Sequence, residues 1–379
     1  MTTQGVSLRP SHVLGRGAVS VFGLGVPKLV ESVFAGRSGI VRRSRTRDWD
    51  VPTSVAGEFP PDVVDALGGS GDLACCAALA AAREALAEAG IAADRRLGLV
   101  LATTKGDLRG VMASDPGDGL GIPARLASRL ADGLGGAQVL GSISCACASG
   151  LVALATASRH LHYGAFEHVL VLGVDILHPF VMAGFGSLHA LDPDRCRPFD
   201  SSRRGVSLGE GAGALVLGRE PSGLGGALVG HGAANDACHV TGPDRRGAGL
   251  RLAAERAIAG AGLLPESMDF VHLHGTATVA NDATEALGLA GLFGGRTPPA
   301  FGTKAQIGHT LGASGVLETV IALAALQLGE VPANVGLEQS DVDPGLALVR
   351  ERRALVRARH ALKVASGFGG VQAATVVCA

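Results

Sequence analysis

The chain has 379 residues, a formal net charge of -1 and a hydrophobic fraction of 47%. This length predicts one large domain or two fused halves, and the near-zero charge gives no reason to expect nucleic acid or an anionic membrane as a partner. Aromatic residues make up only 3% of the chain, so we expect a large core built from Ala, Val and Leu. The 57 glycines alternate with apolar runs, which indicates tight turns and close backbone contacts rather than disorder.

The composition also bears on compartment and metal binding. We expect no apolar run long enough to span a membrane, because Arg83 and Glu84 interrupt the longest helical stretch. The N-terminus lacks a cleavable signal pattern, and seven cysteines without framework spacing predict reduced thiols and a cytoplasmic protein. Cys75-Cys76 and Cys145-x-Cys147 could suggest a metal site, but no nearby His or Cys completes a tetrahedral set, so we expect no metal.

The first half of the chain alternates strand-like apolar runs with helical patterns. Residues 1–17 are expected to be a loosely ordered N-terminus, and the Pro- and charge-punctuated segment 46–61 predicts a surface excursion. Strands are expected at 18–24, 97–103, 137–144, 168–174 and 212–217. Helices are expected at 27–35, 73–89, 123–134 and 151–163.

The second half repeats this alternation. Strands are expected at 225–229, 270–274, 299–301, 347–349 and 361–366, and helices at 247–261, 283–292 and 311–328. The halves, 18–218 and 219–379, echo each other: Ala148-Ser149-Gly150 opens a helical pattern of the same length as the one opened by Ala313-Ser314-Gly315. In this alignment Cys147 falls on Gly312. The pattern predicts an α/β fold built in layers.

A run of small residues surrounds Cys147, from Ser142 to Gly150. This position predicts a thiol where a strand turns into the first turn of a helix. The free backbone N–H groups and the positive dipole end there favour a thiolate, and a lowered pKa makes a cysteine a usable nucleophile. The alternative is a buried structural cysteine, which is the ordinary fate of Cys in an apolar run, and this stretch alone favours that alternative.

Three further passages place polar residues beside small ones at expected strand ends. They are 271–278, which contains His272 and His274; 304–315, which contains Lys304 and His309; and the turn Gly367-Phe368-Gly369-Gly370. One cysteine and two histidines in such positions are typical of nucleophilic acyl transfer with imidazole support.

At these motifs the sequence resembles the β-ketoacyl synthases of the thiolase superfamily, from about residue 18 to the end. The matching segments are Ala146-Cys147-Ala148-Ser149-Gly150, Arg197-Pro198-Phe199-Asp200, Leu208-Gly209-Glu210-Gly211-Ala212-Gly213, His274-Gly275-Thr276-x-Thr278, Lys304-x4-His309-x2-Gly312-Ala313-x-Gly315 and Gly367-Phe368-Gly369-Gly370. Each motif is weak alone, but all occur in the family's order. The resemblance implies a thiolase-like, duplicated five-layer αβαβα architecture.

The resemblance also implies roles for individual residues. Cys147 takes an acyl group from a carrier-protein or coenzyme A thioester. His274 and His309 hold the extender carbonyl and stabilise the enolate formed on decarboxylation. The backbone N–H groups of Cys147 and Phe368 form the oxyanion hole, and Phe368 also gates the acyl pocket, although its ordinary interpretation is a core residue.

Supporting roles follow in the same way. Lys304 supports the histidine pair, Glu318 matches a buried family glutamate, and Thr276 and Thr278 contact the phosphopantetheine arm. No motif includes Cys145 or His272, which we interpret as packing residues. His272 shares strand parity with His274, so the two are expected on one face.

The sequence departs from the family in three places. Val371-Gln372 stands where relatives carry Thr-Asn, which puts the hydrogen bonds near Phe368 in doubt. Gly68-Gly69-Ser70-Gly71-Asp72 replaces a basic segment, which puts carrier-protein docking there in doubt. The stretch between Thr103 and Ser142 is shorter than in elongating synthases, where it builds part of the dimer interface and acyl tunnel.

The implied function is a decarboxylative Claisen condensing enzyme of fatty acid or polyketide/polyene biosynthesis that uses no cofactor of its own. A Cys-His-His set favours this over initiating synthases, which carry Cys-His-Asn. The alternatives are an acyltransferase on the same fold that does not decarboxylate, and a non-catalytic subunit of the chain-length-factor kind, which typically lacks the cysteine. An acyl carrier protein is the expected partner. We also expect a homodimer, or a heterodimer with a related subunit, formed through an edge strand at 137–144.

Overall fold

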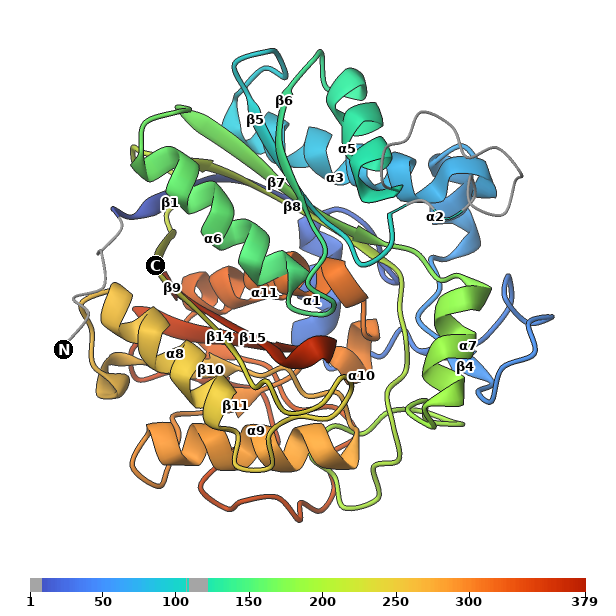
Figure 1. Ribbon diagram of the computed structural model, residues 1–379, viewed down its shortest axis with the longest axis vertical. Helices are drawn as coiled ribbons and strands as arrows, with labels where there is room; N and C mark the ends of the chain where they lie inside the picture. Colours follow the sequence, from blue (N-terminus) through green and yellow to red (C-terminus); the bar gives the residue numbers. More distant parts are fainter. Residues whose placement is uncertain (1–8, 107, 109–121) are drawn as a thin grey trace.

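The computed structural model describes residues 9–106, 108 and 122–379. The expectation for residues 1–8 lies outside the described residues, as does the part of the shortened Thr103–Ser142 stretch at 107 and 109–121. Within the described chain, strands and helices alternate along both halves, as the apolar patterns predict (Figure 1).

The strands form one continuous sheet made of two blocks. Its order is β11(Ala300–Phe301), β10(Phe270–His272), β14(His360–Gly367), β15(Val371–Cys378), β9(Ala227–Asn235), β1(Ser11–Ser20), β8(Gly211–Gly218), β7(His168–Asp175), β5(Gly98–Ala102) and β6(Gln138–Ile143). The blocks join where Ser11 pairs with Leu228 and His12 with Ala227. Short strands lie outside this path: β2(Gly23–Leu24), β3(Val41–Arg42), β4(Val55–Ala56), β12(Glu330–Val331) and β13(Arg353–Ala354).

Helices cover both blocks and fill the space between them, which gives the five layers that the family resemblance implies (Figure 1). One outer layer holds α3(Leu73–Ala89) and α5(Ile122–Gly133), and the other holds α8(Ala248–Gly260) and α9(Val279–Leu292). The central layer consists of α6(Ser149–His162) and α11(Ser314–Leu328). Shorter helices are α1(Val26–Phe34), α2(Pro61–Ala66), α7(Pro179–Ser187) and α10(Lys304–Ile307).

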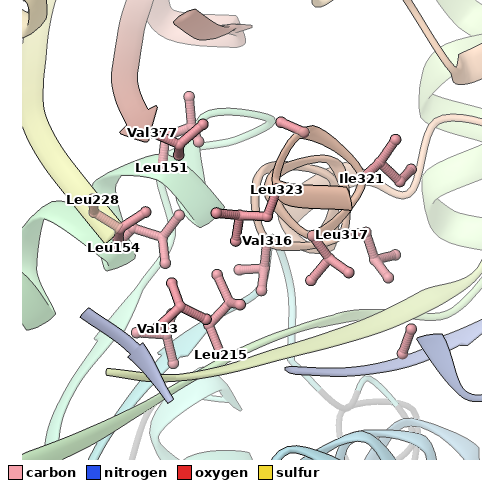
Figure 2. Packing of buried hydrophobic residues seen from close by; sticks show 14 of the residues in the cluster. Val13, Leu151, Leu154, Leu215, Leu228, Val316, Leu317, Ile321, Leu323 and Val377 are labelled. Atoms are coloured by element: carbon pink, nitrogen blue, oxygen red, sulfur yellow. The ribbon is translucent and has the colours of Figure 1, made fainter. Parts of the chain in front are cut away.

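The central layer is packed with aliphatic side chains from both blocks. Figure 2 shows Leu151 and Leu154 of α6 beside Val316 and Leu323 of α11, with Leu215 of β8 below them. All of these side chains are buried, as the aromatic-poor composition predicts. Burial of this apolar surface is the main stabilising contribution and fixes the two central helices against both blocks.

The central helices begin alike and cross at two glycines. A Cβ atom on Gly150 would lie 2.7 Å from Gly315 Cα, so only glycine permits this crossing. The sequence repeat aligns Cys147 with Gly312. The residue before each of them has a left-handed backbone: φ is 48° at Ala146 and 53° at Leu311. Such angles are uncommon outside glycine. The internal repeat predicted from the sequence therefore extends to the backbone of the turn that carries Cys147.

Several element boundaries differ from the expectation. The first strand begins at Ser11 and not at residue 18, because its alternating inner side chains are buried against α3, so residues 11–17 are ordered. The segment 46–61 is partly internal: Glu58 is buried and accepts hydrogen bonds from Ser44 and Thr46. Residues 347–349 form only an isolated bridge, from Leu348 to Ala300.

One apolar stretch reaches membrane-spanning length, contrary to expectation. Leu311–Leu328 has a mean hydropathy of 1.7 over 18 residues, with Glu318 inside it. Of this window, 89% is buried inside the protein. The stretch is apolar on all sides because it lies between the two sheet blocks, so it is a core helix.

Candidate active site

Cys147 sits in the sharp turn between β6 and α6. Ala146 takes the left-handed conformation there, and the Ser149 hydroxyl braces the turn by donating to Ala146 O at 2.6 Å and accepting from Cys145 N at 2.9 Å. The Cys147 side chain is 6% exposed and lines a cavity of about 340 Å3. The strained turn thus presents the thiol to a cavity beside the start of a helix, as predicted.

The electrostatics of this thiol differ from the prediction. Burial raises the pKa of Cys147 to about 12, and the nearby Lys304 ammonium only partly opposes this shift. The helix start was expected to lower the pKa instead. A buried thiolate loses hydration that one helix end does not replace, so the resting thiol is neutral.

His309 reaches the thiol directly from the other half of the chain. Its Nε2 lies 2.9 Å from Cys147 Sγ, and its Nδ1 lies 3.1 Å from Ser314 Oγ at the start of α11. The Thr310 hydroxyl lies a further 3.0 Å from Ser314 Oγ. Both ring nitrogens of His309 therefore have a partner, and the ring is fixed toward the sulfur.

His274 lies just beyond the end of β10 and faces the same cavity. Its ring centre is 5.5 Å from that of His309, with the planes nearly perpendicular. Glu285 of α9 accepts its backbone N–H at 2.6 Å and that of Gly275 at 2.8 Å. The buried His274 Nδ1 has no hydrogen-bond partner among the described residues. The turn is thus held by its backbone, and the ring is left to face the cavity.

Both imidazoles are neutral at physiological pH. Burial places the pKa of His274 and of His309 well below the usual range, and the positive charge of Lys304 lowers both further. A neutral imidazole carries one N–H donor and one acceptor nitrogen. The site therefore offers two uncharged donors beside a neutral thiol.

Lys304 and Glu318 form a fully buried ion pair behind the histidines. Lys304 Nζ donates to Glu318 Oε1 at 2.8 Å and to the His274 carbonyl at 2.5 Å. Glu318 is buried, as the sequence predicts. Lys304 contacts His274 through a backbone carbonyl, and its support of the histidines stays a prediction. His272, interpreted as a packing residue, is buried and contacts Thr303 Oγ1 at 3.2 Å through Nε2.

Phe368 lines the cavity and follows directly after β14. A Cβ atom on Gly367 would lie 3.3 Å from Cys147 N, so the Gly367-Phe368 backbone passes beside the backbone of the cysteine. The Phe368 ring stacks on Phe185 of α7, with ring centres 5.4 Å apart. Phe185 also packs edge-on against His309, at 6.5 Å. This neighbour was not predicted, because α7 was not recognised in the sequence.

Thr276 and Thr278 line the same cavity, and their hydroxyl oxygens are 2.9 Å apart.

Val371-Gln372, which stands where relatives carry Thr-Asn, still supplies hydrogen bonds near Phe368 through Gln372. Its amide donates to Asp236 Oδ2 at 2.8 Å and its carbonyl oxygen accepts from the Ser366 hydroxyl at 2.6 Å. Gln372 therefore keeps the turn at Phe368 tied to the neighbouring loop.

Two buried charged residues beside the site, Glu285 and Lys363, have no role predicted from the sequence. Glu285 holds the His274 turn, and burial raises its pKa to about 7. Lys363, on β14, lies 2.9 Å from Glu318 Oε2. A lysine inside the otherwise apolar run Ala361-Leu362-Lys363-Val364-Ala365 is the signal that would have identified it. Among the described residues, no group of His, Cys, Asp or Glu side chains is arranged to hold a metal ion.

Two family models match this chain in succession. The family model described as "Beta-ketoacyl synthase, N-terminal domain" matches residues 10–222, and that of the "C-terminal domain" matches residues 226–338. The 3-oxoacyl-[acyl-carrier-protein] synthase 2 of Vibrio cholerae is 30% identical over 98% of this chain and 99% of its own.

Solved structures give the same result. The structure described as "The ishigamide ketosynthase/chain length factor" is similar, with a TM-score of 0.86 and 28% identity over 98% of this chain and 99% of that one. The ketosynthase ApeO in complex with its chain length factor ApeC, from Xenorhabdus doucetiae, has a TM-score of 0.81 and 26% identity over 98% of each chain.

Proposed function

Since the chain belongs to the β-ketoacyl synthase family and is a condensing enzyme, we propose that Cys147 carries the growing acyl group and that His274 and His309 act on the extender. One observation carries this assignment. The thiol and two neutral imidazoles, from distant parts of the chain, meet at one cavity, and His309 Nε2 lies 2.9 Å from Cys147 Sγ.

The first step is transfer of an acyl group to Cys147. Because the resting thiol is neutral, it gives its proton to His309 Nε2 as the sulfur attacks the thioester carbonyl. The oxyanion that forms is stabilised by the backbone N–H groups of Cys147 and Phe368. The departing carrier thiolate then takes the proton from His309, so both atoms and charge balance.

The second step is loss of CO2 from a malonyl thioester. His274 and His309 donate N–H hydrogen bonds to its thioester carbonyl and stabilise the enolate oxygen as the C–C bond breaks. The enolate carbon attacks the acyl-Cys147 carbonyl, the C–S bond breaks, and the β-ketoacyl thioester leaves. The Cys147 thiolate then takes a proton from solvent and returns to the neutral resting thiol. His309 needs its proton on Nε2 here, and the Ser314 hydroxyl permits this because it can accept from Nδ1 or donate to it.

The substrate carrier is an acyl carrier protein, as in the name of the Vibrio cholerae relative. Its phosphopantetheine arm would enter the cavity along Thr276 and Thr278. We propose that no cofactor beyond this arm takes part, and that the protein works in the cytoplasm.

The assembly is proposed to be a homodimer, or a heterodimer of the kind described for ApeO and ApeC. Among the described strands, β6 pairs only with β5 and so ends the sheet. Its Val139 is 44% exposed. A free apolar edge directly before the nucleophile is the surface that a second chain would cover. Light scattering at micromolar concentration tests this: a monomer with full condensing activity would contradict it.

The function is tested by incubating the protein with acyl- and malonyl-loaded carrier protein. The proposal predicts CO2 release together with a β-ketoacyl thioester product. Acyl transfer to an alcohol or amine without CO2 release would favour the non-decarboxylating acyltransferase instead. The absence of any acyl-Cys147 would favour a non-catalytic subunit.

A further inference from the structure

A second lysine is buried at the junction of three elements that form the site. Lys363 lies on β14, five residues before Phe368, and its side chain is 0% exposed. It pairs in register with His272 of β10 and lies opposite Glu318 of α11. The chain contains only four lysines, and a charged side chain without exposure costs free energy unless its partners compensate.

The ammonium group of Lys363 is held by backbone carbonyls and by one carboxylate. Its Nζ donates to the carbonyls of Leu273 at 2.9 Å and Val364 at 2.8 Å, with a longer contact of 3.4 Å to His272. Glu318 Oε2 lies 2.9 Å from the same Nζ and balances its charge. An ammonium has three N–H groups, and these partners are enough to satisfy them.

Together the two lysines bind three consecutive carbonyls. Lys363 takes those of His272 and Leu273, and Lys304 takes that of His274. Glu318 lies between the lysines, with one oxygen 2.8 Å from Lys304 and the other 2.9 Å from Lys363. The end of β10, which leads into His274, is thus held from one side by two ammonium groups sharing one carboxylate.

We propose that Lys363 is a positioning residue of the condensing site, which holds the end of β10 so that His274 meets the extender carbonyl and ties this strand to the one that carries Phe368. The inference rests on the function proposed above and adds a residue to it. Lys363 touches neither substrate nor thiol; it acts through His274 and through the strand leading to the Phe368 turn.

The charge of Lys363 adds a second effect. Two ammonium groups and one carboxylate leave a net positive charge beside the histidines, and this charge disfavours imidazolium. Burial lowers the pKa of Lys363 to about 8, so it is charged below that pH. The charged or titratable groups that face His274 from the surrounding elements are Lys304, His309, Lys363 and Glu285. Removal of Lys363 therefore raises the pKa of His274.

The test compares Lys363→Met with Lys363→Arg and with Lys28→Met, a control at an exposed lysine. CO2 release from malonyl carrier protein and acylation of Cys147 are measured separately at neutral pH, with kcat and KM for each. Lys363→Met is expected to slow CO2 release by about 10²-fold, the cost of misplacing a catalytic group by about 1 Å. Acylation continues, and the loss of CO2 release appears in kcat rather than in KM. Lys363→Arg restores CO2 release because it keeps the charge and the N–H donors that hold the end of β10.

Two results would overturn the inference: wild-type CO2 release in Lys363→Met, or an equal loss of both half-reactions that Lys363→Arg does not restore. If Lys363→Met does not fold, as judged by thermal unfolding, Lys363→Gln takes its place under the same criteria. The proposed function fails separately, if the unaltered protein itself releases no CO2.

Discussion

Cys147 Sγ and His309 Nε2 lie 2.9 Å apart although 162 positions separate the two residues in the chain. The contact depends on the crossing of α6 and α11 at Gly150 and Gly315, since each helix begins a few residues after Cys147 or His309. The crossing of the two central helices therefore sets the distance between the Cys147 thiol and the His309 ring. Changes to the crossing and changes to the histidines are expected to have separable effects.

His274→Ala is expected to leave acylation of Cys147 intact and to lower malonyl decarboxylation by about 10²–10³-fold, the usual cost of losing one donor to an oxyanion. The reason is that His274 faces the cavity, whereas the ring that contacts the sulfur in the described part of the chain is that of His309. Acyl loading by mass spectrometry and radiolabelled CO2 release measure the two steps. Equal loss of both would contradict separate roles.

His309→Ala is expected to slow both steps. The sequence alone predicts that acylation survives, since a thiolate at a helix start needs no base. The structure changes this expectation, because the thiol is buried with a pKa raised to about 12 and its proton must pass to His309. The acylation rate of His309→Ala, set beside that of His274→Ala, decides between the two accounts. Wild-type acylation in His309→Ala would favour the account based on sequence.

Gly150→Ala is expected to destabilise the protein by about 1–3 kcal/mol, because the added methyl group would lie 2.7 Å from Gly315 Cα. Gly184→Ala in α7 is the matched control, since a Cβ there meets nothing within 4 Å. The control should be neutral or stabilising, as Ala is the better helix former. Thermal unfolding of both variants gives the comparison. A Gly150→Ala variant as stable as the control would refute the close crossing.

Stability is expected to fall as pH drops from about 6.5 to about 4, through His231. This partly buried ring contacts Ser158 of α6 and Thr375 of β15, and loss of hydration lowers its pKa to about 4. The unfolded chain binds the proton first, so the stabilisation present above pH 6.5 is lost as pH falls through the folded pKa. Denaturant titrations at several pH values measure it. His231→Gln should flatten this dependence; an unchanged slope would contradict the assignment.

Much of the fold follows from local sequence, and the exceptions have physical causes. The helix at 73–89 ends where expected, because Gly90 adopts the left-handed C-cap. The start of the first strand at Ser11 was not predicted. Buried and partly exposed residues alternate there, and this pattern indicates a strand only once its buried face is seen to pack against α3. Cys147, His274 and His309 could be identified from short motifs around each residue.

The remaining site features depend on contacts between distant segments. The neutral state of the Cys147 thiol reflects burial by both halves, which no local pattern contains. Phe185 joins the site through α7, a nine-residue helix whose Gly184 and Gly186 leave no strong helical pattern in the sequence. Lys363 is visible in the sequence as a charge within an apolar strand, but its partner Glu318 is identified only by the fold.

Intact-protein mass spectrometry after incubation with acyl carrier protein tests the central claim most directly. The wild-type chain and Cys145→Ala should both gain the mass of one acyl group, because Cys145 is not the residue in contact with His309. Cys147→Ala should gain none, although it folds as the wild type does. Acyl loading that survives in Cys147→Ala would contradict the account.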